Sequence, residues 1–201
     1  MNRKELLLFQ SAWMKDESDS PIILSNRIRL ARDLENVPFP HMLSPEKAVE
    51  VERLLAGALE SIEIDGQRLT YLPLTELSDV ELQVLIEKHL ISPALVSERR
   101  GRGVALTPDH RIAVMVNEED HLRLQVLMAG KNLAESYRLA QILDDELEKR
   151  LNFAYRETQG YLTACPTNVG TGLRASVMVH LPGLVMVNRA QQILGSLAHM
   201  G

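Results

Sequence analysis

The spacing of apolar residues divides the chain into helical and strand-like segments. Steps of three and four predict helices over residues 44–62 and 131–153. The first begins at Ser44-Pro45, a favourable cap followed by a proline at the first helical position. A Ser78-x-x-Glu81 capping box predicts another helix, ending before Ser92-Pro93. The apolar stripes of the three helices are Val51, Leu54, Leu55, Ala58 and Ile62; Val80, Val84, Leu85 and Leu90; and Leu133, Tyr137, Ala140, Leu143, Leu147 and Leu151.

Strand-like segments have the shorter, two-residue period or form brief apolar runs. They cover residues 22–32, 67–72, 111–117, 121–128, 161–164 and 175–181, and a last helix covers 189–199. Residues 1–21 are interpreted as an N-terminal lead-in whose polar end is exposed, and residues 98–103 as a mobile basic loop. Helices interleaved with mostly hairpin-connected strands predict an α+β fold, a mostly antiparallel sheet flanked by helices.

Composition narrows the class of protein. The 201 residues, 45% of them apolar, are enough for one domain with a substantial core. The formal net charge of -5 disfavours a generally basic nucleic-acid binder. No apolar run is long enough to cross a membrane, and Leu6–Phe9 is too short for a secretory signal. We therefore expect a cytoplasmic protein with neither nucleic-acid nor membrane partners.

Arginines near the predicted strand ends are the first candidate chemistry. Arg27 and Arg29 are two residues apart and share one face of a strand, while Arg123 and Arg174 lie beside other strands. Guanidinium groups stay charged and present forked donors to phosphate. Several together could neutralise a triphosphate without the Gly-rich P-loop, which this sequence lacks. Each arginine alone is also typical of a solvated face or a salt bridge.

An acidic cluster and a single cysteine supply groups of the opposite character. Glu118-Glu119-Asp120 precedes Arg123, and carboxylates beside arginines can orient a cationic substrate and accept its proton. The alternative is a solvated hairpin turn. Cys165 precedes a Gly-containing loop, where the Thr167 hydroxyl and nearby arginines would favour a thiolate; the alternative is a small buried hydrophobe. One cysteine and six scattered histidines give no expectation of a dedicated metal site.

Three segments carry a family resemblance: Ser25–Arg29, Asn117–Arg123 and Cys165–Ala175 resemble, in order, motifs of the ATP:guanido phosphotransferases. Within this family the chain is most similar to the bacterial protein-arginine kinase branch, because only a short segment precedes Ser25. The resemblance implies that residues 22–201 form a guanido kinase catalytic-domain-like fold. It also implies C-terminal truncation, because the family's downstream Arg-Gly-x-x-Gly-Glu motif is not reached.

The resemblance also implies an activity and a set of site residues. The reaction would transfer the γ-phosphoryl group of ATP, bound with Mg²⁺, to the guanidinium of arginine residues in proteins. Glu119 would grip the guanidinium and act as base, and Cys165 would contact the substrate as a thiolate. Asn26 stands where a second serine is common and is expected to point away from Arg27 and Arg29. The implied ATP-binding residues are Ser25, Asn26, Arg27, Ile28, Arg29, His89, Arg123, Arg174, Ala175, Ser176, Val177 and Met178.

The implied partners are protein substrates bearing arginine, an activator protein and, in full-length relatives, a second copy of the chain, in a stress response. Two other functions stay open. One is a truncated, non-catalytic nucleotide-binding or interaction module of the same family. The other is a nucleic-acid binder that uses Arg99, Arg100 and Arg102, which the net charge and the 4% aromatic content disfavour.

Overall fold

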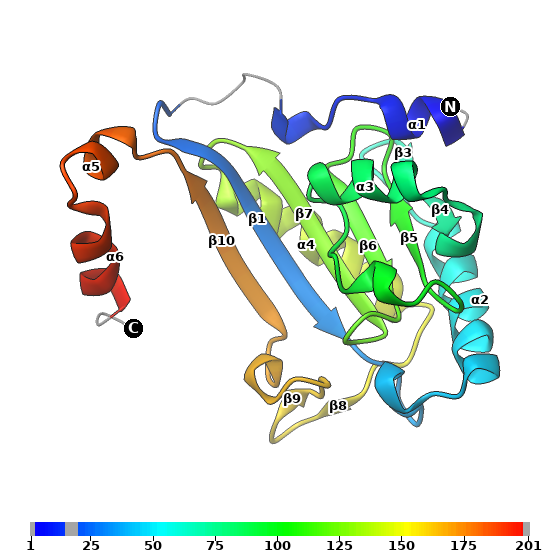
Figure 1. Cartoon of the computed structure of the whole chain (residues 1–201). Helices are drawn as coiled ribbons and strands as arrows, with labels where there is room; N and C mark the ends of the chain where they lie inside the picture. Colours follow the sequence, from blue (N-terminus) through cyan, green and yellow to red (C-terminus); the bar gives the residue numbers. More distant parts are fainter. Residues whose placement is uncertain (1–2, 15–19, 199–201) are drawn as a thin grey trace.

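A six-stranded antiparallel sheet with helices on both faces organises the chain (Figure 1). The computed structural model describes residues 3–14 and 20–198. The strand order is β10-β1-β7-β6-β5-β4, and the predicted α+β class is confirmed. The strands are β1 (Ile23–Arg32), β4 (Thr70–Pro73), β5 (Gly103–Leu106), β6 (Ile112–Val116), β7 (Leu122–Ala129) and β10 (Leu173–Val179). Two small hairpins pair β2 (Glu63–Ile64) with β3 (Gln67–Arg68) and β8 (Tyr155–Arg156) with β9 (Gly160–Tyr161).

The helices begin where the sequence places caps. Ser44 accepts a hydrogen bond from the backbone N–H of Lys47, and both bonds of the Ser78–Glu81 capping box are present. These bonds satisfy N–H groups that have no partner within a helix. The helices are α1 (Arg3–Leu8), α2 (Pro45–Glu60), α3 (Asp79–Glu87), α4 (Leu133–Glu148), α5 (Pro182–Met186) and α6 (Ala190–Ala198), and a short 3₁₀ helix, η1, spans Ala12–Met14.

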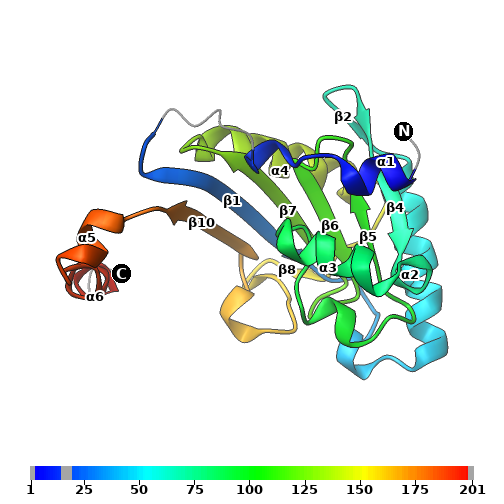
Figure 2. The same cartoon turned by 45° about the horizontal axis from the view of Figure 1, so that its top comes forward.

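Two apolar cores lie on opposite faces of the sheet. One joins α2 and α4 to alternate residues of the central strands, such as Ile28 and Leu124. The other lies under α1 and α3 and includes Leu6 and Leu85. Figures 1 and 2 show α4 behind the sheet and α1 and α3 in front of it. Residues 3–14 therefore share the core of the domain, while β1 and β10 keep an open front face.

The polar run of the expected lead-in lies mainly in 15–19, outside the described residues, as does residue 199 of the last predicted helix. Several local predictions were wrong. The segment 67–72 is broken at Leu69, the 161–164 segment is strand only at its first residue, and α3 and α4 end earlier than expected. Strand β5 and helix α5 were not predicted. The expected stripe residues Leu54, Val80 and Tyr137 are exposed.

The loop at 98–103 has more contacts than its composition suggests. Arg99 donates to the carbonyl of Leu77 and pairs with Asp79, and Arg102 donates to the carbonyls of Ala94 and Leu95. These contacts connect the loop to the rest of the domain, and its mobility stays a prediction. No helix in the described ranges is long and apolar enough to span a membrane.

Candidate active site

Strand periodicity brings the predicted arginines together on the open face of the sheet. Arg29 on β1 lies opposite Arg174 on β10, and Arg27 lies opposite Ser176. On the other side of β1, Arg123 of β7 pairs in register with Ala31. No described residue forms a hydrogen bond or ion pair with the side chain of Arg27, Arg29 or Arg174, and the Arg29 Nε is buried without a partner. These side chains are therefore available to a ligand.

The electrostatics of this face favour an anion. Burial, and then the neighbouring guanidinium groups, lower the pKa of Arg29 to about 10. Burial, Arg174 and Arg123 lower the pKa of Arg27 in the same way. Both groups stay protonated near neutral pH, so the site holds a concentrated, partly desolvated positive charge. Such a charge attracts polyanions such as a triphosphate.

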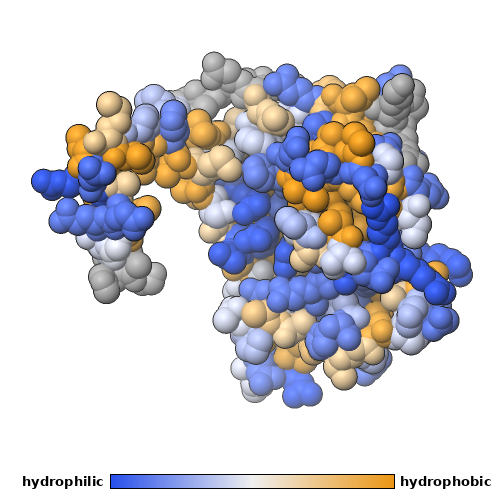
Figure 3. Space-filling model, in the orientation of Figure 1, coloured by the Kyte–Doolittle hydropathy of each residue, from blue (hydrophilic) through white to orange (hydrophobic). Residues whose placement is uncertain are grey.

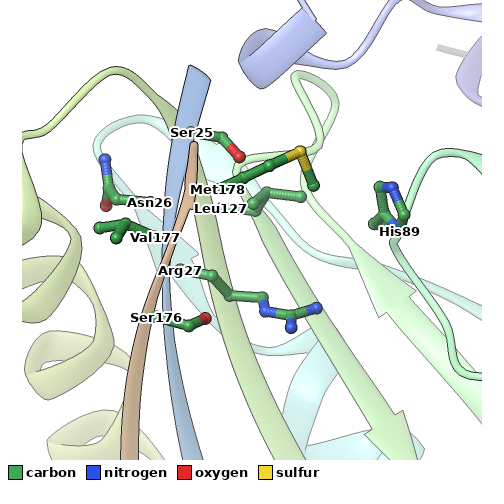
Figure 4. Close-up of a pocket in the computed structure, with 8 residues that line it drawn as sticks. All are labelled: Ser25, Asn26, Arg27, His89, Leu127, Ser176, Val177 and Met178. Carbon is green, nitrogen blue, oxygen red and sulfur yellow. The ribbon is translucent and has the colours of Figure 1, made fainter. Parts of the chain in front are cut away.

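Three adjoining cavities form one trough along this face. The first and second share Arg27 and His89, and the second and third share Arg29 and Arg123. In Figure 3 hydrophilic residues gather over this part of the sheet. The first cavity, of about 260 Å³, is lined by Ser25, Asn26, Arg27, His89, Leu127, Ser176, Val177 and Met178 (Figure 4). The third includes Glu119, Cys165, Thr167 and Arg174.

Four of the predicted ATP-binding residues turn their side chains to the opposite face. Figure 4 shows Asn26 and Val177 pointing away from Arg27 and Met178. Asn26 donates to the carbonyl of Gly130 and accepts from Ser136 on α4, which fulfils the expectation that it points away. Ile28 is in the α4 core, and Ala175 lies opposite it on β10. Asn26 and Val177 still contribute to the lining of the first cavity, whereas Ile28 and Ala175 line none of the three cavities. The remaining predicted ATP-binding residues are Ser25, Arg27, Arg29, His89, Arg123, Arg174, Ser176 and Met178, all of which line the trough.

His89 is held at the trough by contacts from two directions. It has a left-handed backbone, with φ of 57°, just after α3. Gln125 on β7 donates to its carbonyl at 2.7 Å. The Trp13 ring lies 5.3 Å from the His89 ring, and the Trp13 indole N–H donates to the carbonyl of Lys88. Gln125 and Trp13 were not predicted as site residues; the two-residue spacing of Gln125 from Arg123 was the available signal for the first.

The turn between β6 and β7 places two carboxylates beside Arg123. Glu118 is nearly buried, pairs with Arg123 at 2.5 Å and accepts a hydrogen bond from Ser92. Glu119 is 44% exposed and accepts from the other terminal nitrogen of Arg123 at 2.9 Å. Arg123 would thus remain paired with Glu118 if Glu119 turned to another cation. Glu118 belongs to the predicted acidic cluster, but no separate role was predicted for it.

Cys165 lies at the same end of the trough as Glu119. Its sulfur lies 3.0 Å from the Thr167 hydroxyl, the pairing that the sequence suggested. The loop closes on β1 at Gly172, where φ is 63° and an added Cβ would lie 2.6 Å from the carbonyl oxygen of Ala31. A positive φ and a close backbone approach both require glycine here. The loop therefore holds a partly exposed thiol in the trough, outside both apolar cores.

The arrangement places cations and anions in sequence along one trough. Arginines can bind a polyphosphate in the middle, and Glu119 and Cys165 can bind a cationic group beside its end. Among residues 3–14 and 20–198, no group of three His, Cys, Asp or Glu side chains is placed to hold a metal ion.

Fold and site together define a domain built on an antiparallel sheet, with a cationic trough suited to a polyanion on its open face. The model of the ATP:guanido phosphotransferase C-terminal catalytic domain matches residues 50–201. The chain belongs to the ATP:guanido phosphotransferase family. This confirms the family resemblance.

Known relatives and solved structures agree with this assignment. The chain is 46% identical over 194 residues to a protein-arginine kinase of Desulforamulus reducens, covering 95% of this chain and 54% of the relative. It is 47% identical over 198 residues to one of Symbiobacterium thermophilum, covering 96% and 55%. The chain thus spans about half the length of these curated relatives.

A duplicated taurocyamine kinase from Schistosoma mansoni, with bound transition-state analogue components, is similar in structure. Its TM-score is 0.77 at 28% identity, over 94% of this chain and 27% of that one. Lombricine kinase has a TM-score of 0.72 at 26% identity, over 90% and 53%.

Proposed function

We propose that this chain forms the ATP-binding and substrate-contacting part of a protein-arginine kinase. The reaction transfers the γ-phosphoryl group of ATP to a guanidinium nitrogen of an arginine in a protein substrate. One observation carries the proposal: a single trough connects Arg27 and Arg29 of β1 and Arg174 of β10 to Glu119 and Cys165. The names of the curated relatives support the choice of protein arginine as substrate.

The residues that line the trough indicate where each part of the nucleotide binds. The cavity with His89, Leu127 and Met178 offers an imidazole ring and apolar side chains to the adenosine. The triphosphate crosses Arg27 and Arg29, whose side chains have no partner among the described residues. The γ-phosphoryl group then lies near Arg174 and Cys165. Mg²⁺ would enter with ATP, because it binds phosphate oxygens and retains water ligands.

The substrate end must make a poor nucleophile reactive. A guanidinium is protonated at neutral pH, so its nitrogen lone pairs are delocalised and unreactive. Glu119 leaves Arg123 to its second partner, Glu118, binds the guanidinium and accepts a proton from the attacking nitrogen. A Cys165 thiolate supplies a second negative contact. The nitrogen–phosphorus bond forms as the bond from the γ-phosphorus to the bridging oxygen breaks, and ADP leaves with the electron pair.

The arginines stabilise the charge that develops on the transferring group. Preorganised cations in a partly desolvated site act on the transition state without having to reorganise. Holding both reactants in line contributes through orientation. The protein substrates, an activator protein, a homodimer, a cytoplasmic location and a role in stress response stay predictions.

The test uses this chain with MgATP and an arginine-rich protein such as casein. We expect ATP binding, and acid-labile phosphate on arginine detected by mass spectrometry. Arg29→Ala should weaken ATP binding about tenfold or more, because a charge-assisted contact is lost. Arg138→Ala is the matched control: Arg138 lies on α4 and pairs with Glu135.

Two results contradict the proposal in different ways. ATP binding without transfer to protein arginine would instead favour the nucleotide-binding module. Equal ATP affinity in Arg29→Ala and Arg138→Ala would remove the assigned phosphate site itself. Glu119→Gln separates the roles further, since it should lower the transfer rate and leave ATP affinity unchanged.

A further inference from the structure

A cluster of buried titratable groups lies behind the acidic turn and takes no part in the mechanism above. Asp33, Asp120 and His121 are 1%, 0% and 0% exposed. Asp33 follows β1, and Asp120 and His121 precede β7. Two carboxylates are costly to bury unless each is satisfied by hydrogen bonds.

The hydrogen bonds of the cluster reach two separate segments of the site. Asp33 Oδ1 accepts from the backbone N–H of His121 at 2.9 Å and lies 2.8 Å from the His121 Nδ1. Asp120 Oδ1 accepts from the backbone N–H of Ala164 at 2.8 Å. Ala164 directly precedes Cys165, and Asp120 directly follows Glu119. Asp120 is therefore the link between the turn that carries the carboxylate and the loop that carries the thiol.

The carboxyl groups of Asp33 and Asp120 lie close enough for each to act on the other. Asp33 Oδ2 and Asp120 Oδ2 are buried, and neither has a hydrogen-bond partner among the residues that the structure describes. A proton on Asp120 that is shared with Asp33 would satisfy both atoms. Burial, and then the hydrogen bond and charge of Asp33, raise the pKa of Asp120 to about 7. The pair thus keeps a shared proton in moderately acidic solution and loses it as the pH rises through this value.

We propose that Asp120 is a positioning residue that fixes the Cys165 loop against the Glu119 turn through the Ala164 backbone. The effect of Asp120 on catalysis rests on the proposed function, whereas its hydrogen bond with the Ala164 backbone does not. The charged and titratable groups around Asp120 are Asp33 from the end of β1, Glu119 and His121 from its own turn, and Cys165 from the loop. When Asp33 and Asp120 are both ionised, their repulsion loosens the link and separates the two groups that bind the guanidinium.

The first measurement is hydrogen exchange of the Ala164 amide in the full chain. Asp120→Ala removes the acceptor of the Ala164 N–H. It should speed the exchange of this amide about tenfold or more, because one charge-assisted hydrogen bond is lost. Asp120→Asn keeps an oxygen for Ala164 and offers an N–H to Asp33, so it mimics the protonated pair. In this variant the Ala164 amide should stay protected. Unchanged protection in Asp120→Ala overturns the proposal.

The second measurement uses the single cysteine as a reporter. The alkylation rate of Cys165 by iodoacetamide, followed against pH, should contain a step near pH 7 in the native chain. This step should be absent from Asp120→Asn and from Asp33→Asn. Asp109→Asn is the control, because Asp109 accepts from Arg111, far along the sequence from the Cys165 loop. If the step near pH 7 is retained in both Asp120→Asn and Asp33→Asn, the proposal is overturned, even if Asp120→Ala fails to fold.

These readouts separate the positioning role from the kinase assignment. Neither hydrogen exchange nor alkylation requires a nucleotide. If the loop depends on Asp120 but no phosphate is transferred, positioning stands and the kinase proposal fails. If transfer occurs, Asp120→Ala should lower kcat and leave the KM for ATP unchanged, while Asp120→Asn restores kcat. A native kcat in Asp120→Ala would overturn the positioning role alone.

Discussion

Arg29 on β1 lies directly opposite Arg174 on β10, so two cationic side chains share one face of neighbouring antiparallel strands. Like charges placed opposite each other in a sheet are destabilising. Burial, and then the neighbouring guanidinium groups of Arg27 and Arg174, lower the pKa of Arg29 to about 10. The ligand-free protein therefore carries an electrostatic cost that a bound polyphosphate relieves.

Removing one member of this pair should affect the free and bound protein in opposite directions. Arg174→Gln should raise the free energy of unfolding of the free chain by about 0.5 kcal/mol, because a like-charge contact is lost. It should also reduce the rise in melting temperature on adding MgATP, because a phosphate contact is lost. Thermal melts with and without nucleotide measure both effects.

The control is Arg156→Gln, an exposed arginine on the small β8–β9 hairpin that lines none of the trough cavities described here. This variant should keep the native response to nucleotide. A full response in Arg174→Gln as well would remove Arg174 from the phosphate site.

Arg32 and Arg29 are close in sequence but belong to opposite faces of β1. Arg32 is 3% exposed, binds Asp144 through two nitrogens at 2.9 and 2.6 Å, and lies over the Tyr161 ring. Arg32→Ala should lower the free energy of unfolding by about 3–5 kcal/mol, because it leaves Asp144 buried and unpaired. Arg29→Ala should lower ATP affinity and leave stability nearly unchanged. Urea unfolding and nucleotide titration of both variants distinguish the roles; matching stability losses would contradict the assignment.

The two-residue period of a strand made this distinction available from sequence. It separates Arg27 and Arg29 from Ile28 and Arg32, and the capping residues Ser44 and Ser78 likewise fixed the starts of two helices. Strand alternation and helix caps depend only on the geometry of a few neighbouring residues, so a short stretch of sequence is enough to predict them.

Contacts between distant segments could not be predicted in the same way. Nothing near Asp33 in the sequence indicates that it packs against Asp120, or that Asp120 binds the backbone of Ala164. Strand β5 was missed because the arginines and glycines before it resemble a loop, whereas its pairing with β4 and β6 depends on the assembled sheet. Tertiary contacts of this kind override local propensity.

Trp13 should affect nucleotide binding although it lines none of the trough cavities described here. Its ring packs 5.3 Å from the His89 ring, and its N–H donates to the Lys88 carbonyl. Trp13→Ala should weaken ATP binding about fivefold, because the lost aromatic contact is worth about 1 kcal/mol. The affinity for inorganic tripolyphosphate should stay native, because the arginines are untouched. Equal weakening of both ligands in calorimetric titrations would show general disruption instead, and Tyr155→Ala, an exposed aromatic on β8, is the control.

His110 makes the attachment of the N-terminal segment dependent on pH. Its ring is buried, with Nε2 donating to the Leu6 carbonyl at 2.8 Å and Nδ1 accepting from Ser11 at 3.0 Å. Both bonds fit the neutral ring, because a protonated Nδ1 has no lone pair for the serine. Burial, and then the charge of Lys88, lower the pKa of His110 from 6.5 to about 4.

The sign of the pH effect follows from where the proton binds. Between pH 6.5 and about 4 the unfolded chain takes up a proton at His110 that the folded chain does not. The free energy of unfolding should therefore fall as the pH falls through this window, by up to about 3 kcal/mol. Gln at this position offers one donor and one acceptor but does not titrate, so His110→Gln should flatten this part of the profile. Urea unfolding of both proteins across the window gives the difference directly, since Asp120 and the other titrating groups contribute equally to each. Parallel profiles for the native chain and the variant would mean that His110 titrates alike in the folded and unfolded states.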